Sequence, residues 1–124
     1  ACAASFTQMA AIAALSGPQD AVDEMRECYR ERRDYMVEAL NQIDGVSCRK
    51  PEGTFYLFPN IKSFGIPSKE FAERLLVEEG VAALSGASFG CYGEGYLRFS
   101  VSNSLEEIQK GVERLCRFTK KLHR

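Results

Sequence analysis

Hydrophobic residues recur with helical spacing in four parts of the chain. Residues 5–15 are rich in alanine and apolar nearly all round, which predicts a helix packed on several sides. Residues 18–44 carry apolar side chains at intervals of three, four or seven, which predicts a long amphipathic helix. Two further helical patterns begin at Ser68 and Ser104, and the first of them ends near Gly80.

The same pattern indicates how the helices begin and which side chains they bury. Pro18 suits the first turn of the long helix, and Ser68 is predicted to cap the third helix with its hydroxyl. Ser104 and Glu107 have the spacing of a capping box. The long helix is predicted to face the core through Val22, Met25, Tyr29, Met36, Leu40 and Ile43.

Short segments with strand character separate these helices. They are apolar or aromatic and bounded by turn residues, and they cover residues 46–48, 54–58, 81–84 and 96–101. The resulting order is helix, long helix, two strands, helix, two strands, helix. This order predicts an α+β domain in which a small sheet of three or four strands has helices packed on one face, preceded by the long amphipathic helix.

The composition is that of a soluble folded domain. Hydrophobic residues make up 45% and charged residues 27%, and no apolar run approaches the roughly 18 residues of a membrane span. Sixteen Lys and Arg against seventeen Asp and Glu give a net charge of −1, so no broad positive field would recruit a nucleic acid. Neither a membrane nor a nucleic acid is therefore an expected partner.

The cysteines indicate free thiols rather than a disulfide framework or a zinc site. Five of them are scattered without a Cys-x-x-Cys pair, and the single histidine is the near-terminal His123. Free thiols favour a reducing compartment. Cys28 and Cys116 fall in helical patterns and are predicted to be small buried hydrophobes. Cys91 lies in a glycine-rich stretch, but no histidine lies near it in the sequence to activate the thiol.

Residues 85–100 are the first candidate for a functional site. They combine four of the ten glycines with a strand pattern in which alternation places Tyr96, Arg98 and Ser100 on the face away from the apolar side chains. Glycine lets backbone N–H groups approach a ligand, and arginine offers a two-point fork to a carboxylate or phosphate. The pattern indicates an anion site, and it leaves open an exposed strand arginine in a surface ion pair.

Residues 51–58 are the second candidate. A glycine followed by aromatic residues at the start of a strand could place Phe55 or Tyr56 against a ligand, and packing in the core is the alternative. Neither a P-loop nor a dinucleotide-binding glycine pattern occurs in the chain. The residues by themselves therefore indicate an anion-binding α+β domain.

Together the two candidates resemble a known family. Residues 51–58 (PEGTFYLF), 86–90 (GASFG) and 93–100 (GEGYLRFS) are similar to motifs in the C-terminal small domain of the aspartate aminotransferase family. These are fold type I enzymes that use pyridoxal phosphate, and the resemblance extends over nearly the whole chain. One departure is Ser85, which stands where the family commonly has proline.

The resemblance implies a role for two residues of the site. Arg98 matches the arginine that grips the substrate α-carboxylate, and Phe55 matches an aromatic residue that borders the substrate pocket. The family's Schiff-base lysine, its aspartate at the pyridine nitrogen and its phosphate cup belong to the large domain, and no segment here matches the lysine motif. The resemblance thus implies no catalytic, cofactor-binding or metal-binding residue in this chain.

The chain is accordingly expected to be the C-terminal small domain of a larger enzyme. Residues 1–17 would form a connecting helix, residues 18–44 the long interdomain helix, and residues 45–124 the sheet and its covering helices. The expected parent is a cytoplasmic, homodimeric, pyridoxal-phosphate-dependent aminotransferase of amino-acid metabolism or biosynthesis, which acts on an amino acid and a 2-oxo acid. The chain alone is expected to be inactive because it lacks the lysine.

Two alternative functions remain open at this point. Another fold type I enzyme, such as a lyase, a decarboxylase or a synthase, would use the same carboxylate-binding arginine. A stand-alone binding module without catalysis would explain the absence of the lysine motif.

Overall fold

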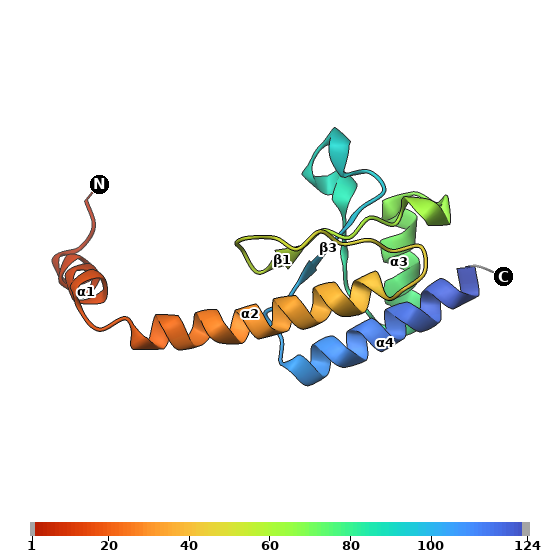
Figure 1. The fold of residues 1–124 in the computed structure, drawn as a ribbon. Helices are drawn as coiled ribbons and strands as arrows, with labels where there is room; N and C mark the ends of the chain where they lie inside the picture. Colours follow the sequence, from red (N-terminus) through yellow and green to blue (C-terminus); the bar gives the residue numbers. More distant parts are fainter. Residues whose placement is uncertain (1, 123–124) are drawn as a thin grey trace.

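The computed structural model describes residues 2–122, which fold as an α+β domain (Figure 1). The predicted fold class is therefore confirmed. In chain order the elements are α1 (Ser5–Ser16), α2 (Asp20–Asn41), β1 (Tyr56–Leu57), the 3-10 helix η1 (Lys62–Phe64), α3 (Ser68–Glu79), β2 (Leu84–Ser85), the 3-10 helices η2 (Gly86–Phe89) and η3 (Cys91–Gly93), β3 (Leu97–Ser100) and α4 (Leu105–Leu122).

The three strands form one antiparallel sheet with β3 in the centre, in the order β1-β3-β2. Backbone hydrogen bonds extend the pairing of β1 with β3 beyond the strand ends. The Val101 N–H donates to the Phe55 carbonyl at 2.9 Å, and the Ile61 N–H donates to the Gly95 carbonyl at 2.8 Å. These bonds tie the segments of both sequence motifs to each other.

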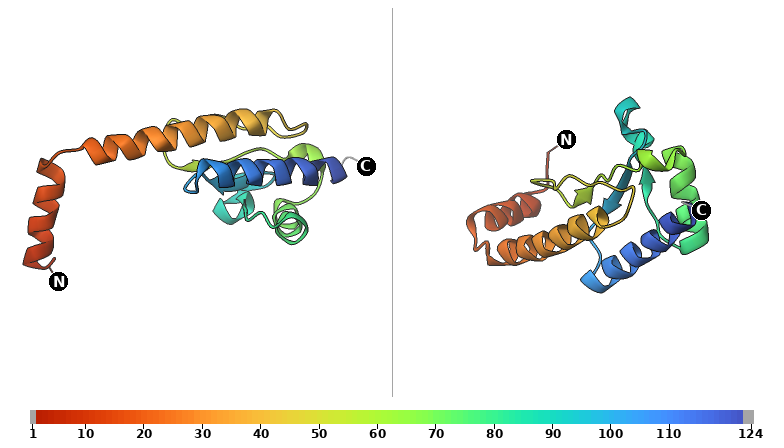
Figure 2. Two further views of the ribbon diagram at one scale, coloured as in Figure 1. Left: turned by 90° about the horizontal axis from the view of Figure 1, so that it is seen from below. Right: turned by 45° about the vertical axis from the view of Figure 1, so that its right-hand side comes forward.

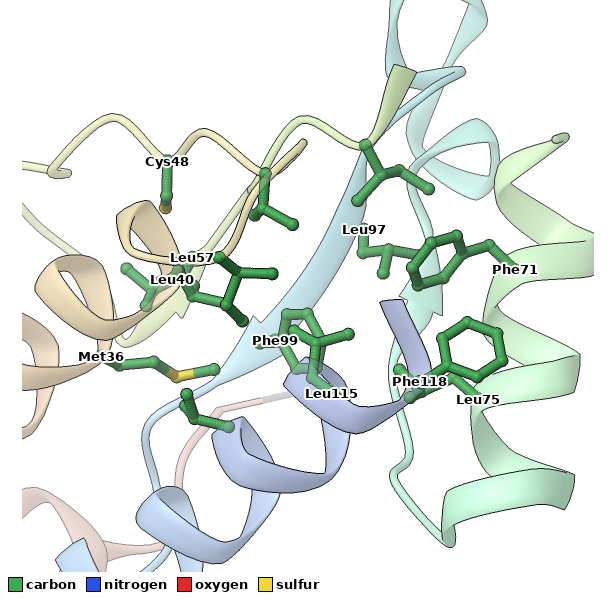
Figure 3. Packing of buried hydrophobic residues seen from close by; sticks show 14 of the residues in the cluster. Met36, Leu40, Cys48, Leu57, Phe71, Leu75, Leu97, Phe99, Leu115 and Phe118 are labelled. Atoms are coloured by element: carbon green, nitrogen blue, oxygen red, sulfur yellow. The ribbon is translucent and has the colours of Figure 1, made fainter. Parts of the chain in front are cut away.

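Helices α2, α3 and α4 enclose the core together with the inward face of the sheet (Figure 3). The labelled side chains in that view are Met36 and Leu40 from α2, Cys48 from the segment between α2 and β1, Leu57 from β1, Phe71 and Leu75 from α3, Leu97 and Phe99 from β3, and Leu115 and Phe118 from α4. Phe118 packs edge-on against Phe71 with ring centroids 5.0 Å apart. Burying an apolar side chain of this size stabilises the fold by about 1.5–3 kcal/mol.

Helix α1 stands apart from the sheet and from the other helices (Figure 2). None of its residues is buried, and Phe6 and Leu15 are 78% and 85% exposed. The prediction of a helix packed on several sides is therefore wrong for residues 2–122. The apolar composition is present, but no other described element lies against it.

Helix α2 buries apolar side chains only in its second half. Met36 and Leu40 are buried, whereas Val22 and Met25 are 51% and 56% exposed. Cys28 is also exposed, so its predicted burial is wrong. The physical reason is visible in Figures 1 and 2: the sheet and α4 lie beside the C-terminal half of α2, and its N-terminal half projects beyond them.

The strands are shorter than the sequence pattern predicts. Residues 46–48 form a single isolated bridge, in which Ser47 pairs with Asn60. Strand β1 is limited by Thr54, whose φ of 63° departs from strand geometry, and by Pro59, which has no N–H to donate. Strand β2 lies at the C-terminal end of the predicted third strand and just after it.

The two predicted helix caps have different outcomes. The Glu107 N–H donates to the Ser104 hydroxyl at 3.4 Å, as the capping box predicts. Ser68 does not cap α3, because it is the first residue of that helix and its N–H donates to the Glu94 carboxylate at 2.8 Å. A side chain distant in the sequence therefore takes the capping role.

Among the residues that the structure describes, no group of three or more His, Cys, Asp and Glu side chains lies close enough to hold a metal ion. All five cysteines are free thiols, of which Cys48 is buried and Cys116 partly buried. No described helix is both long and apolar enough to cross a membrane. His123 lies outside the described residues.

Candidate functional site

Strand β3 places Arg98 on the face of the sheet opposite the core. Burial alternates along the strand, with Leu97 and Phe99 buried and Arg98 half-buried, as strict alternation predicts. In the antiparallel register Leu84 lies opposite Arg98, and Tyr56 lies opposite Ser100. Paired residues on antiparallel strands share a face, so this face of the sheet carries Arg98 among the side chains of both neighbouring strands.

Two aromatic rings flank the guanidinium of Arg98. Its Cζ lies 4.1 Å from the ring centroid of Tyr56 and 4.4 Å from that of Phe89. Each such cation–π contact is worth about 0.5–1 kcal/mol when exposed and more when water is excluded. Contacts with two rings restrict the positions that the guanidinium can adopt.

The guanidinium N–H donors of Arg98 are left unpaired among residues 2–122. There, the backbone of Arg98 pairs with Leu84 in the sheet, but no carboxylate and no other acceptor contacts the guanidinium N–H groups. By contrast, Arg33 pairs with Asp34 at 2.7 Å, and Arg117 pairs with Glu79 at 3.0 Å. An oriented and half-buried guanidinium with free donors is a receptor for a planar two-oxygen anion, of which a carboxylate is the simplest.

The second predicted residue, Phe55, contacts the ring of Tyr56, which in turn contacts this guanidinium. Its ring centroid is 4.4 Å from that of Tyr56 and 6.0 Å from that of Tyr29, and the side chain is 41% exposed. The preceding residue, Thr54, adopts a left-handed φ of 63°, which is rare for a β-branched residue. Backbone strain of this kind concentrates at functional sites, because the surrounding structure has to maintain it.

A hollow of about 180 Å³ opens beside the guanidinium. It is lined by Tyr56, Ala82, Ala83, Leu84, Arg98, Phe99 and Ser100. A larger hollow of about 290 Å³ lies between α4 and the segment before β2, but neither Arg98 nor Phe55 lines it. The smaller hollow is the better candidate for a ligand site because it contains the unpaired cation.

Phe89 reaches Arg98 from the loop of residues 86–95, which joins β2 to β3 and protrudes from the sheet (Figure 1). Glu94 of this loop accepts hydrogen bonds from the N–H and the hydroxyl of Ser68, both at 2.8 Å. These bonds, first the one from the N–H, lower the pKa of the Glu94 carboxyl below its ordinary value. The loop is thus held at the N-terminus of α3 by an ionised side chain.

Sequence reasoning located Arg98 and its face but missed two of the residues around it. Tyr56 was a candidate through its place in the aromatic motif, and the structure puts it on the guanidinium. Phe89 and Glu94 lie in the segments 86–90 and 93–100 that resemble the family, but neither follows a periodic pattern that would assign it to the arginine site. The positions of both side chains depend on how the loop of residues 86–95 reverses the direction of the chain, which the local sequence does not define.

Known proteins resemble this chain over nearly all of its length. The profile of the family described as aminotransferase class I and II matches residues 1–115. YugH of Bacillus subtilis, which carries an aminotransferase name, is 46% identical over 120 residues, covering 97% of this chain and 31% of YugH. The LL-diaminopimelate aminotransferase of Moorella thermoacetica is 44% identical over 110 residues, covering 89% of this chain and 28% of that protein.

A solved structure agrees with these sequence matches. The aromatic aminotransferase from Pyrococcus horikoshii superposes with a TM-score of 0.92 at 40% identity, covering 97% of this chain and 32% of that one. The chain spans about a third of the length of the relatives it matches. The match to the profile covers far more than half of the sequence, and on that basis the chain belongs to the aminotransferase class I and II family.

Proposed function

We propose that the chain is the C-terminal small domain of a pyridoxal-phosphate-dependent aminotransferase, which moves an amino group between an amino acid and a 2-oxo acid. In this proposal Arg98 binds the α-carboxylate of the substrate, and Phe55 borders the substrate pocket. One observation carries it: the guanidinium of Arg98 lies between two rings with its N–H donors unpaired, in a chain that matches aminotransferases along its length.

The geometry supports two-point binding of a carboxylate. Tyr56 and Phe89 hold the guanidinium plane, so its outward edge can present parallel N–H groups to the two oxygens. The two rings also lower the polarity around the cation, which strengthens an ion pair there. Binding the carboxylate in one orientation places the substrate Cα at a defined position, which is the contribution of Arg98 to the reaction.

In this proposal the cofactor is bound outside this chain. Pyridoxal phosphate supplies the electron sink for this chemistry and requires a lysine amine. The two lysines outside the α-helices are engaged elsewhere: Lys50 pairs with Asp34 at 2.8 Å, and the Lys62 amine lies 5.0 Å from the ring centroid of Tyr96. We assign the cofactor to the rest of the parent enzyme, and we expect the 124-residue chain alone to be inactive.

The exposed N-terminal segment is consistent with a larger parent. In the proposal residues 1–17 form the connection to a large domain and residues 18–44 form the interdomain helix. The apolar side chains of α1, none of which is buried, would lie against that large domain. The parent would be a cytoplasmic homodimer of amino-acid metabolism, in which this domain closes over the substrate.

Substitution of Arg98 in the full-length parent tests the proposal. Charge-assisted hydrogen bonds contribute about 1.5–3 kcal/mol each, so loss of two predicts that Arg98→Leu lowers kcat/KM by about 100-fold or more, mainly through KM. Arg98→Lys should recover only part of this loss, because an ammonium is a point charge. Lys69→Leu, which removes a cation from the exposed side of α3, is the control.

Kinetics that are unchanged in both Arg98 variants would refute the carboxylate role. Transfer of the amino group to a panel of 2-oxo acids separates an aminotransferase from a lyase, decarboxylase or synthase of the same family. The coding sequence upstream of residue 1 distinguishes a fragment from a free-standing module, since only a fragment is preceded by the lysine motif in frame.

A further inference from the structure

We infer that Glu94 is a positioning residue for the Arg98 site. Its carboxylate, bound at the N-terminus of α3, holds the loop of residues 86–95 so that Phe89 stays stacked on the guanidinium. Glu94 would hold Phe89 in place whatever reaction the parent enzyme catalyses. Its effect on substrate binding, in contrast, rests on the proposed function of Arg98.

The carboxylate of Glu94 makes two bonds to one residue of α3. One oxygen accepts from the Ser68 N–H and the other from the Ser68 hydroxyl, each at 2.8 Å. Since the Ser68 hydroxyl donates to the carboxylate, the Ser85 hydroxyl, 2.8 Å away, is the donor in the bond between the two serines. Ser68 is fully buried and Ser85 is 8% exposed, so the chain of bonds leads from the loop into the interior.

The loop is closed tightly enough to transmit this attachment. Gly86 and Gly93 approach each other so closely that neither has room for a Cβ. The Gly86 N–H donates to the Tyr96 carbonyl at 2.8 Å, and the Gly93 N–H donates to the Gly90 carbonyl at 2.9 Å. A loop with its two ends in contact moves as one body, so fixing Glu94 also fixes the short helix that carries Phe89.

Phe89 has little else to hold it in place. Its side chain is 47% exposed, and its ring contacts are with Arg98 and with Phe58, whose ring centroid is 6.1 Å away. The position of the ring over the guanidinium therefore depends on the position of the loop backbone. Loss of the attachment would let the ring leave and would expose one face of the cation to water.

A second carboxylate on α3 provides a matched control. Glu70 is in the first turn of the same helix and interacts with the same helix dipole, but its charge partner is Arg74 at 3.9 Å, within α3. Glu70→Gln therefore removes a negative charge near the N-terminus of α3 without removing a bond to the loop. A role of Glu94 limited to helix stability would give the two variants similar effects.

The first experiment measures the position of the ring directly. In the 124-residue chain, the NMR resonance of the Arg98 Nε–H should be shifted upfield by the two flanking rings, and Phe89→Leu should reduce that shift. Glu94→Gln should reproduce most of the Phe89→Leu change, Ser68→Ala part of it, and Glu70→Gln none. The inference is overturned if Phe89→Leu moves the resonance while Glu94→Gln and Ser68→Ala both leave it in place.

The second experiment uses the full-length parent. Glu94→Gln and Phe89→Leu should each raise KM for the amino-acid substrate about two- to five-fold with kcat nearly unchanged, the size expected for loss of one cation–π contact. The double variant should be no worse than either single one, because both changes remove the same contact. Additive effects, or a KM unchanged by Glu94→Gln, would overturn the inference.

The two proposals can fail separately. If Arg98→Leu leaves KM unchanged, the carboxylate role of Arg98 fails, and the NMR result still decides whether Glu94 positions Phe89. If Arg98→Leu raises KM while Glu94→Gln matches wild type in both experiments, only the role of Glu94 fails.

Discussion

The contact between Gly86 and Gly93 gives a sharp quantitative test of the loop beside Arg98. A Cβ built on Gly93 would lie 2.5 Å from the carbonyl carbon of Gly86, whereas real Cβ atoms almost never approach another heavy atom within 3.0 Å. Gly93→Ala must therefore push the two backbones apart. The bonds at risk run from the Gly86 N–H to the Tyr96 carbonyl, 2.8 Å, and from the Tyr96 N–H to the Gly93 carbonyl, 3.2 Å.

The expected loss follows from these contacts. Overpacking costs about 1–3 kcal/mol, and a weakened backbone hydrogen bond costs about 1 kcal/mol net, so Gly93→Ala should lower the free energy of unfolding by about 2–4 kcal/mol. Urea unfolding of the 124-residue chain, followed by circular dichroism, measures it. With a slope of about 2 kcal/mol per molar urea, the midpoint should fall by about 1–2 M.

A glycine without neighbours provides the control. No atom lies within 4 Å of a Cβ built on Gly53, so Gly53→Ala should change the free energy of unfolding by less than about 0.5 kcal/mol. If Gly93→Ala unfolds at the same urea concentration as Gly53→Ala, the close approach of the two backbones, and with it the rigidity of the loop, is refuted.

Two further predictions concern the remainder of the domain. Phe118 is fully buried, so Phe118→Ala should cost about 3–5 kcal/mol in the same urea assay, whereas Val77→Ala at an 85% exposed site should be near neutral; equal midpoints would contradict the assigned core. Lys121, and next Arg117, lower the pKa of the Glu79 carboxyl in the folded chain. The ion pairs of Glu79 therefore stabilise the fold at a pH above the pKa that this carboxyl has in the unfolded chain. This stabilisation is lost as the pH falls through the lowered pKa of the folded chain. Glu79→Gln should therefore lower the melting temperature near pH 7 but hardly near pH 2, and an equal loss at both would contradict it.

Much of the secondary structure could be predicted because it depends on local patterns. A stripe of apolar residues at helical spacing is found in α2, α3 and α4 whatever their neighbours, and the capping box at Ser104 needs only residues three apart. The same patterns failed where burial depends on a partner. Val22 and Cys28 continue the stripe of α2 but lie beyond the reach of the sheet and α4, so they are exposed.

The face of Arg98 could also be predicted, because side chains alternate strictly along a strand. Its surroundings could not be predicted in the same way. Phe89 belongs to a loop that is closed by the contact of Gly86 with Gly93, and Glu94 takes over the capping role assigned to Ser68 from a position 26 residues away. These contacts join segments whose separation in sequence carries no periodic signal.

The sequence by itself determined the α+β class, the order of the helices and the placement of one arginine on the open face of a strand, since each follows from the period of a helix or a strand. Only the tertiary structure decided which rings flank that arginine, that its donors are left unpaired, and that the carboxylate of Glu94 holds the loop beside it. The physical reason is that hydrogen bonds and ring contacts act over a few ångströms in space, irrespective of the length of chain between the partners.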